Sequence, residues 1–322
     1  MKFIDLFCGC GGLTLGLEKA GMECTVSIDN LKEISKFHHK NFKHDFIFCD
    51  LKNIKKTIDL IKKYNFDMIV GGPPCQDFSS AGKRDESLGR ADLTYKFSKI
   101  ICKTKPKYFL MENVERIKKS KIFTRIIKKF QRDKYFMSAF VLNAYNCNVP
   151  QNRKRLFLFG QLDGQNNLLQ FFVKKRLSLV PMTVRKYFKD KLDYKFYYRH
   201  PRNYNRRGIF SIDEPSPTIR GVNRPIPSGY KIRPNDPKVN SLKNVKVMTT
   251  KERSLIQTFP EKFSFFGKKT LDEQLIGNSV PVNMAKLIGE SILDLIRSKK
   301  KYVSKNLFGD NVFVLTDKVL ES

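Results

Sequence analysis

Short apolar runs alternate with longer amphipathic segments through the first half of the chain. Most apolar runs end at a glycine, an acidic residue or a proline, whereas the longer segments repeat their apolar positions with helical spacing. The apolar runs predict strands at residues 2–7, 24–28, 46–49, 67–70, 108–111, 136–142 and 155–159. The amphipathic segments predict helices at residues 13–20, 52–64, 92–103 and 119–134. This alternation predicts an α/β fold with a doubly wound, mostly parallel sheet.

The pattern changes at about residue 162, where the regular alternation stops. Prolines recur from there on, and residues 197–208 interleave aromatic rings with arginines, which predicts a smaller, irregular, mainly β domain over residues 162–270. Apolar residues at helical spacing over residues 283–299 predict a helix that packs back on the first domain. We therefore expect a large domain at residues 1–161, a return to it at residues 271–300, and an unassigned tail at residues 301–322.

The charge of the chain is strongly positive. Its 62 Lys and Arg residues against 31 Asp and Glu residues give a net charge of +31. Such a charge favours a polyanionic partner, of which nucleic acid is the first candidate. The alternative is a general enrichment in lysine, because lysines are spread along the whole chain.

Cysteine and histidine usage predicts reduced thiols and no metal. The seven cysteines show no paired spacing, and the four histidines form no zinc-type grouping. The N-terminal segment does not have the pattern of a signal peptide, and the chain has no apolar run long enough to span a membrane. We expect a cytoplasmic protein without a membrane partner.

One cysteine stands out by its position. The apolar run at residues 67–70 leads into Gly71-Gly72-Pro73-Pro74-Cys75, so that two prolines fix the backbone just before a thiol at the end of a predicted strand. Ligands and chemistry collect at the carboxyl ends of such strands. The alternative is a buried structural cysteine in a tight turn.

A glycine loop and two acids follow the first three predicted strands. Gly9, Gly11 and Gly12 follow the first strand, Asp29 the second and Asp50 the third. Glycines let a ligand approach the backbone closely, and Asp29 and Asp50 can accept hydrogen bonds from ribose hydroxyls and an adenine amino group. The glycine spacing does not match the dinucleotide fingerprint. An adenosine-containing cofactor without a pyrophosphate fits this pattern, as do acids that merely cap helices.

Five stretches of the chain resemble, in order, motifs of the bacterial-type DNA (cytosine-5)-methyltransferase family. They are Asp5-Leu6-Phe7-Cys8-Gly9-Cys10-Gly11-Gly12, Gly72-Pro73-Pro74-Cys75-Gln76, Glu112-Asn113-Val114, Gln151-Asn152-Arg153-Lys154-Arg155 and Gly277-Asn278-Ser279-Val280-Pro281. The resemblance implies a Rossmann-like methyltransferase domain followed by a target-recognition domain. It also implies S-adenosylmethionine as cofactor, S-adenosylhomocysteine as product, no metal, and double-stranded DNA as substrate.

The resemblance assigns four catalytic residues. Cys75 is the nucleophile that adds to carbon 6 of a flipped-out cytosine, and Glu112 engages N3 and the amino group. Arg155 contacts the base oxygen, and Arg153 orders the nucleophile loop or the backbone. Arg153 and Arg155 alternate along one presumed strand, which would direct both side chains to one face.

The resemblance also implies two binding sets. The cofactor-binding residues are Phe7, Gly9, Gly11, Gly12, Asp29, Asp50, Leu51, Pro74, Leu93, Asn278, Ser279 and Val280. The DNA-binding residues are Ser79, Gln151, Arg206, Arg207, Thr218, Arg220 and Arg224. Two positions depart from the family: Asp29 stands where glutamate is more frequent, and Asn30 replaces an aromatic residue.

The expected activity is that of a DNA (cytosine-5-)-methyltransferase, acting as a monomer in a restriction-modification system. A cognate restriction endonuclease would share its target site without forming a stable complex with it. Two alternatives stay open, a transfer-RNA cytosine-5 methyltransferase and a DNA-binding module without catalysis. The Cys-Phe-Thr element of the transfer-RNA branch is absent from the sequence, and an intact Cys75 with Glu112 and Arg155 argues against lost catalysis.

Overall fold

The computed structural model describes residues 1–74, 91–162, 165–201 and 206–298. The chain divides into two compact units. The first unit comprises Met1–Leu142, Lys154–Leu177 and the chain from Ala285, and the second comprises Asn143–Arg153 and Ser178–Met284.

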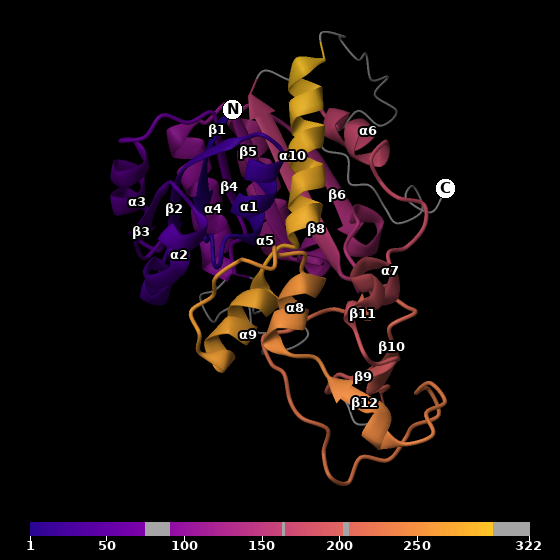
Figure 1. The fold of residues 1–322 in the computed structure, drawn as a ribbon. Coiled ribbons are helices and arrows are strands. Elements are labelled where there is room, and N and C mark those ends of the chain that lie inside the picture. Colours follow the sequence, from indigo (N-terminus) through magenta and orange to yellow (C-terminus); the bar gives the residue numbers. More distant parts are fainter. Residues whose placement is uncertain (75–90, 163–164, 202–205, 299–322) are drawn as a thin grey trace. The chain divides into compact units, whose positions relative to one another are not determined.

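The first unit is built on a seven-stranded sheet in the described part of the chain (Figure 1), with the order β3-β2-β1-β4-β5-β8-β6. Its strands are β1 (Lys2–Leu6), β2 (Glu23–Asp29), β3 (Asp45–Phe48), β4 (Met68–Gly71), β5 (Tyr108–Val114), β6 (Tyr135–Asn143) and β8 (Lys154–Leu162). The pairs β1–β2, β1–β4, β2–β3 and β4–β5 are parallel, whereas β5 and β8 are antiparallel. The predicted mostly parallel α/β sheet is confirmed.

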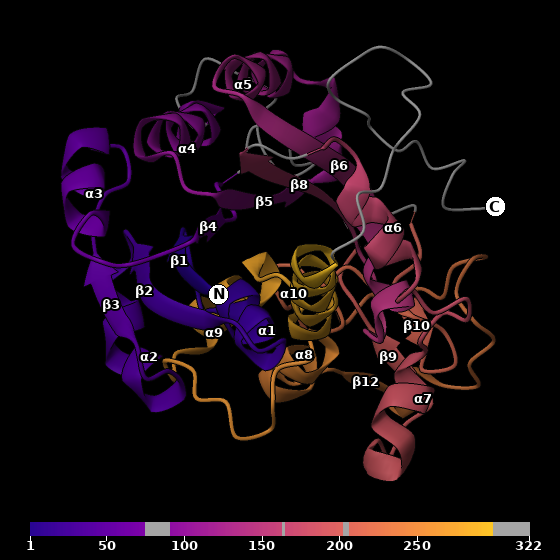
Figure 2. The same cartoon turned by 90° about the horizontal axis from the view of Figure 1, so that it is seen from above.

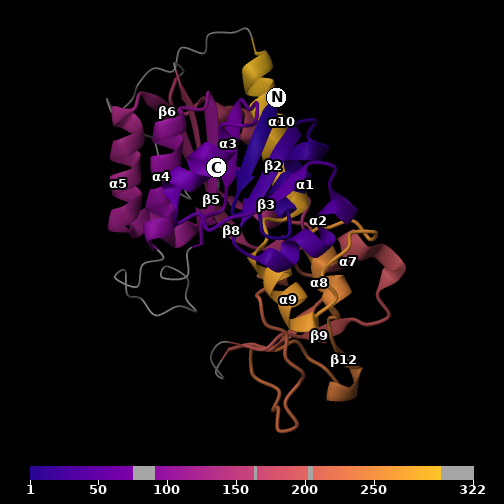
Figure 3. The same ribbon diagram turned by 90° about the vertical axis from the view of Figure 1, so that its left-hand side faces the viewer.

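Helices cover both faces of this sheet, as Figures 2 and 3 show. One face carries α3 (Ile54–Ile61), α4 (Ala91–Thr104) and α5 (Lys121–Arg132), and the other carries α1 (Gly12–Lys19) and α10 (Val282–Arg297). Two shorter helices, α2 (Ser35–Asn41) and α6 (Leu168–Lys174), flank the sheet. Gly289 of α10 packs so closely on α1 that a Cβ there would lie 2.7 Å from Cβ of Ala20. The layers bury an apolar core that includes Ile69 of β4, and every residue of β4 is buried.

Local sequence explains where several helices begin. The side chain of Asn53 accepts a hydrogen bond from the Lys56 N–H at the start of α3, and Ser120 accepts one from the Phe123 N–H at the start of α5. These side chains satisfy backbone donors that have no partner inside the helix.

The second unit is smaller and irregular. It holds a three-stranded sheet with the order β10-β9-β12 and a two-stranded pair, β11-β7, among its described residues. Its strands are β7 (Gln151–Asn152), β9 (Phe196–Tyr198), β10 (Ile209–Ser211), β11 (Ser216–Pro217) and β12 (Val245–Val247), and its helices are α7 (Val184–Phe188), α8 (Thr250–Ile256) and α9 (Lys269–Asn278). The start of α8 is a capping box, because the side chains of Thr249 and Glu252 each accept a hydrogen bond from the other residue's N–H.

Candidate active site

The chain after β1 forms a tight loop at the carboxyl edge of the sheet. The N–H groups of Phe7 and Cys8 both donate to the Ile28 carbonyl of β2. Gly11 has a φ of 84°, and a Cβ at this position would lie 2.5 Å from the ring of Phe42. Glycine is therefore required at residue 11 both by the backbone conformation and by the space available. The loop then opens directly into α1.

Asp29 supports this loop from the end of β2. Its Oδ2 accepts a hydrogen bond of 2.8 Å from the Gly9 N–H, and its Oδ1 accepts one of 3.1 Å from the Leu31 N–H. Burial raises the pKa of the Asp29 carboxyl above its ordinary value, and the backbone N–H groups oppose that shift. Each carboxylate oxygen retains a second lone pair, so Asp29 can also accept hydrogen bonds from a bound ligand.

The other predicted cofactor residues of the first unit differ in exposure. Asp50 is exposed and accepts a hydrogen bond of 2.9 Å from the Lys52 N–H, and Pro74 is exposed as well. Leu51 and Leu93 are buried, at 1% and 8% exposure. Phe7 is partly buried, packs against the core and has a positive φ of 62°.

Glu112 and Arg155 form an ion pair at the end of β5. The Arg155 Nε lies 3.0 Å from Glu112 Oε1, and both side chains are largely buried. The other carboxylate oxygen, Oε2, lies 3.2 Å from where a Cβ of residue 72 would be, so Gly72 leaves room for it. The pair thus lies next to the turn that leads to Cys75.

Asn113 holds that same turn. Its side-chain amide donates a hydrogen bond of 3.2 Å to the Pro73 carbonyl, and its Oδ1 accepts one of 2.8 Å from the Val114 N–H. The sequence favours a structural turn residue over a catalytic residue at Asn113. The predicted residues Cys75 and Ser79 lie outside the described residues.

Asp5 is a residue that sequence reasoning missed. It is fully buried in β1, and its Oδ2 accepts a hydrogen bond of 2.5 Å from the Thr14 hydroxyl of α1. Burial raises the pKa of Asp5 from its ordinary value near 3.8 to about 7. The sequence feature that could have indicated this buried carboxyl is an acidic residue inside the apolar run Phe3-Ile4-Asp5-Leu6.

The second unit holds the remaining predicted residues. Arg153 is only 1% exposed, and its guanidinium donates to the carbonyls of Ile219 (3.1 Å), Gly277 (3.1 Å) and Ser279 (2.8 Å). Gln151 is buried too, where its side-chain oxygen accepts from the Ile219 N–H at 2.9 Å. These two side chains bind the backbone that carries Asn278, Ser279 and Val280 and the backbone that follows Thr218.

The expectation that Arg153 and Arg155 lie on one strand face is wrong. Residue 153 separates β7 from β8, and β7 pairs with β11. The side chain of Arg153 binds backbone carbonyls of the second unit, whereas that of Arg155 pairs with Glu112 in the first.

The predicted DNA-binding arginines have varied surroundings. Arg207 forms an ion pair with Glu214 and lies over the ring of Phe210, 4.5 Å from its centroid. Arg206 and Arg224 are exposed, whereas Arg220 is half-buried and donates to the His200 carbonyl.

No group of three or more His, Cys, Asp or Glu side chains in the described part of the chain could hold a metal ion. No helix among the described residues combines the length and apolarity needed to cross a membrane.

An open α/β sheet with a glycine loop, an acid that supports it and a carboxylate–guanidinium pair at the same carboxyl edge defines a class of ligand-binding α/β enzymes. The family model of C-5 cytosine-specific DNA methylases matches residues 1–294, and the chain belongs to this family. It is therefore a DNA cytosine-5 methyltransferase.

Curated relatives extend over almost the whole chain. The type II methyltransferase M.HindV of Haemophilus influenzae is 55% identical over 91% of this chain and 97% of its own length. The type II methyltransferase M.HgiDI of Herpetosiphon aurantiacus is 49% identical over 91% of this chain and 94% of its own length.

Solved structures share the fold. The Entamoeba histolytica methyltransferase EhMeth superposes with a TM-score of 0.68 at 20% identity, covering 92% of this chain and 99% of its own. The S. pombe Dnmt2 methyltransferase has the same TM-score at 16% identity, again covering 92% of this chain and 99% of its own.

Proposed function

We propose that the enzyme transfers a methyl group from S-adenosylmethionine to carbon 5 of a flipped-out cytosine in a specific duplex DNA sequence, through a covalent adduct of Cys75. The observation that carries this proposal is the Glu112–Arg155 pair, with its 3.0 Å separation, beside the Gly72-Pro73 turn. In a chain of this family, that turn presents the nucleophile and the pair faces the base.

The donor set of the first unit fits S-adenosylmethionine. Asp29 keeps acceptor capacity for ribose hydroxyls, the exposed Asp50 can accept from an adenine amino group, and the loop at Gly9 leaves its backbone open to close approach. When bound, S-adenosylmethionine supplies an electrophilic methyl group. Asn278, Ser279 and Val280 stay predictions from the family motif.

Carbon 5 of cytosine is a weak nucleophile, so the base must be activated first. The Cys75 thiolate attacks carbon 6, and a carbon–sulfur bond forms while the ring gains electron density. Glu112 delivers a proton to N3 and accepts from the amino group, and Arg155 donates to the base oxygen. After methylation, water takes the proton from carbon 5, the carbon–sulfur bond breaks with release of the thiolate, and N3 returns its proton to Glu112. Carbon 6 is inaccessible inside a base stack, which is why base flipping is part of the proposal.

The names of the two bacterial relatives favour DNA modification over modification of transfer RNA, because both are type II methyltransferases. We propose that the enzyme protects host DNA as a monomer in a restriction-modification system, with a cognate endonuclease that shares its site. Bisulfite sequencing of DNA from cells that express the protein identifies the target cytosine.

Trapping tests the covalent step. A duplex with 5-fluorocytosine at the target position should give a denaturation-resistant complex with the wild-type protein and none with Cys75→Ser. Cys102→Ser is the matched control: its thiol is buried, and burial raises its pKa to about 12, so it is a poor nucleophile. The control should trap as wild type does. A complex of equal yield in Cys75→Ser would overturn the proposal.

A further inference from the structure

Three consecutive backbone carbonyls in the second unit are each bound by a different arginine. The Thr218 carbonyl accepts a hydrogen bond of 3.0 Å from Arg199, and the Ile219 carbonyl accepts one of 3.1 Å from Arg153. The Arg220 carbonyl accepts from Arg253. Guanidinium groups make strong charge-assisted hydrogen bonds, so this stretch is held more firmly than an ordinary loop.

Arg253 in turn forms a buried ion pair with Glu273. Their side chains are 4% and 3% exposed, and the Arg253 Nε lies against Glu273 Oε2. Burial lowers the pKa of the Arg253 guanidinium, and the Glu273 carboxylate opposes this shift. Arg253 belongs to α8 and Glu273 to α9, so the pair joins the two helices.

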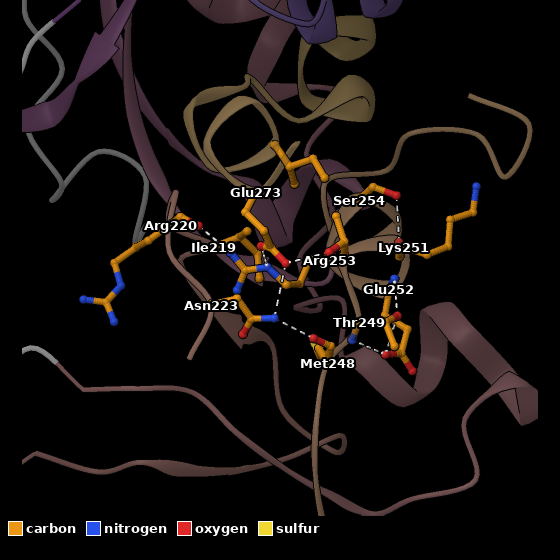
Figure 4. Close-up of polar contacts among 12 residues, drawn as sticks. Ile219, Arg220, Asn223, Met248, Thr249, Lys251, Glu252, Arg253, Ser254 and Glu273 are labelled. Atoms are coloured by element: carbon orange, nitrogen blue, oxygen red, sulfur yellow. Dashed lines mark hydrogen bonds and ion pairs between the residues drawn. The ribbon is translucent and has the colours of Figure 1, made fainter. Parts of the chain in front are cut away.

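Glu273 also binds Asn223, three residues beyond the Arg220 carbonyl that Arg253 holds. Its Oε1 accepts hydrogen bonds from Asn223 (3.2 Å) and Thr250 (2.8 Å), and Asn223 also donates to the Met248 carbonyl at 2.8 Å. Figure 4 shows Asn223 and the Arg220 carbonyl converging on the Arg253–Glu273 pair, while the Arg220 side chain extends away from it. The ion pair therefore fixes both ends of the stretch from residue 220 to residue 223.

A buried ion pair is a costly way to join two helices, because apolar side chains of similar volume often stabilise a core as well or better. Apolar side chains have no directional donors or acceptors. The Arg253–Glu273 pair does, and it forms hydrogen bonds with the Arg220 carbonyl and the Asn223 side chain, which precede the exposed Arg224. The geometry thus assigns the pair a conformational task in addition to packing.

We propose that Arg253 and Glu273 are positioning residues for target recognition, which fix the backbone of residues 220–223 before DNA binds. This inference rests on the proposed function, in which Arg220 and Arg224 contact DNA. The pair itself is buried and touches no substrate. Its effect is to present these arginines in one arrangement, which lowers the conformational cost of binding.

A tryptophan reporter tests the order of the segment without any assay of activity. The chain has no tryptophan, and Val222 lies within the segment at 55% exposure, so Val222→Trp gives a single-site signal. In DNA-free protein, the fluorescence anisotropy of this tryptophan should be lower in the double variant Val222→Trp with Arg253→Lys. A lysine ammonium cannot reproduce the planar guanidinium fork that serves two acceptors. Arg176→Lys is the matched control: Arg176 also serves two acceptors, the carboxylates of Glu290 and Asp294, but in the first unit. The control should leave the anisotropy unchanged.

A second experiment measures DNA affinity, with the same substitutions in a protein that lacks Val222→Trp. Arg253→Lys should raise the Kd for cognate duplex by about tenfold or more, the effect of losing one charge-assisted hydrogen bond. Its affinity for S-adenosylmethionine should stay at the wild-type value, as should both affinities of Arg176→Lys. Should Arg253→Lys fail to fold, the double substitution Arg253→Met with Glu273→Leu replaces the pair by apolar groups and leaves no unpaired buried charge. It should show the same loss of anisotropy and of DNA affinity.

Unchanged anisotropy in the folded variants would overturn the positioning role, whatever the protein does to DNA. Lower anisotropy with unchanged DNA affinity would overturn it as well, because the ordered segment would then be irrelevant to recognition. Failure of the proposed function is seen separately, as a wild-type protein that methylates no DNA.

Discussion

The Nε atom of Arg155 lies 3.0 Å from Oε1 of Glu112, across two antiparallel strands. Glu112 is paired in register with Phe157, so Arg155 is its diagonal neighbour on β8. The two side chains that we place on the base are thus fixed to each other through backbone ladders. A change to either one alters the other's surroundings.

Substitutions in this pair should separate chemistry from stability. Glu112→Gln removes the proton carrier but keeps the shape, so single-turnover methylation should slow by roughly 10²–10⁴-fold. Its side-chain oxygen can still accept a hydrogen bond from Arg155, so the loss of stability should be smaller than that of a variant with no partner for the buried charge. Arg155→Met leaves a largely buried carboxylate without its partner and should cost about 3 kcal/mol or more in urea unfolding. The exposed neighbour Lys154→Met is the control and should keep both properties. A Glu112→Gln enzyme with the wild-type rate would remove Glu112 from the mechanism.

The cofactor loop should not accept a side chain at residue 11. Gly11→Ala combines a positive φ of 84° with a clash against Phe42, so we expect a stability loss of about 1–2 kcal/mol from the backbone alone and weaker binding of S-adenosylmethionine. Gly21→Ala is the matched control, because Gly21 also has a positive φ but open space around its Cα. Calorimetry of cofactor binding should show the loss at residue 11 only. Equal affinity in both variants would contradict the assignment of this loop.

Arg153 should act mainly through stability. Arg153→Met removes three buried hydrogen bonds to backbone carbonyls, so the free energy of unfolding should fall by about 3 kcal/mol or more. Urea denaturation followed by circular dichroism measures this loss. A variant as stable as wild type but slow in methylation would instead favour a direct role of Arg153 at the base.

Asp5 should make stability depend on pH. The native carboxyl keeps its proton up to about pH 7, whereas the unfolded one releases it near its ordinary pKa of 3.8. The stabilisation from neutral Asp5 is therefore complete below that ordinary pKa and is lost as the pH rises to about 7. In Asp5→Asn this loss is absent. Relative to Asp5→Asn, the wild-type protein should lose up to about 1.4 kcal/mol of unfolding free energy per pH unit from pH 5 to pH 7. Above pH 7 the difference between the two proteins should stay constant. Urea titrations of both proteins and of the exposed-site control Asp59→Asn measure it; a constant difference would show that Asp5 is ionised throughout.

The sequence predicted those features that depend on local periodicity. Buried parallel strands are apolar along their whole length, and Asp29 follows such an apolar run. Its place at a strand end could therefore be predicted from the sequence. The environment of Arg153 was not accessible in this way. Its partners, Ile219, Gly277 and Ser279, are at least 66 residues away in the chain, and no local pattern records such contacts. The burial of Asp5 and the Arg253–Glu273 pair also depends on how separate elements pack, which the periodicity of a single element does not record.

The close packing of α10 on α1 has a consequence for synthesis. The apolar face of α1, with Leu17 fully buried in the finished protein, packs against Gly289, which leaves the ribosome long after α1 does. At translation rates of about 5–20 residues per second, the apolar face of α1 stays uncovered by α10 for a time on the order of tens of seconds. Since α1 continues directly from the glycine loop, we expect nascent chains that end before residue 289 to be prone to aggregation and unable to bind the methyl donor.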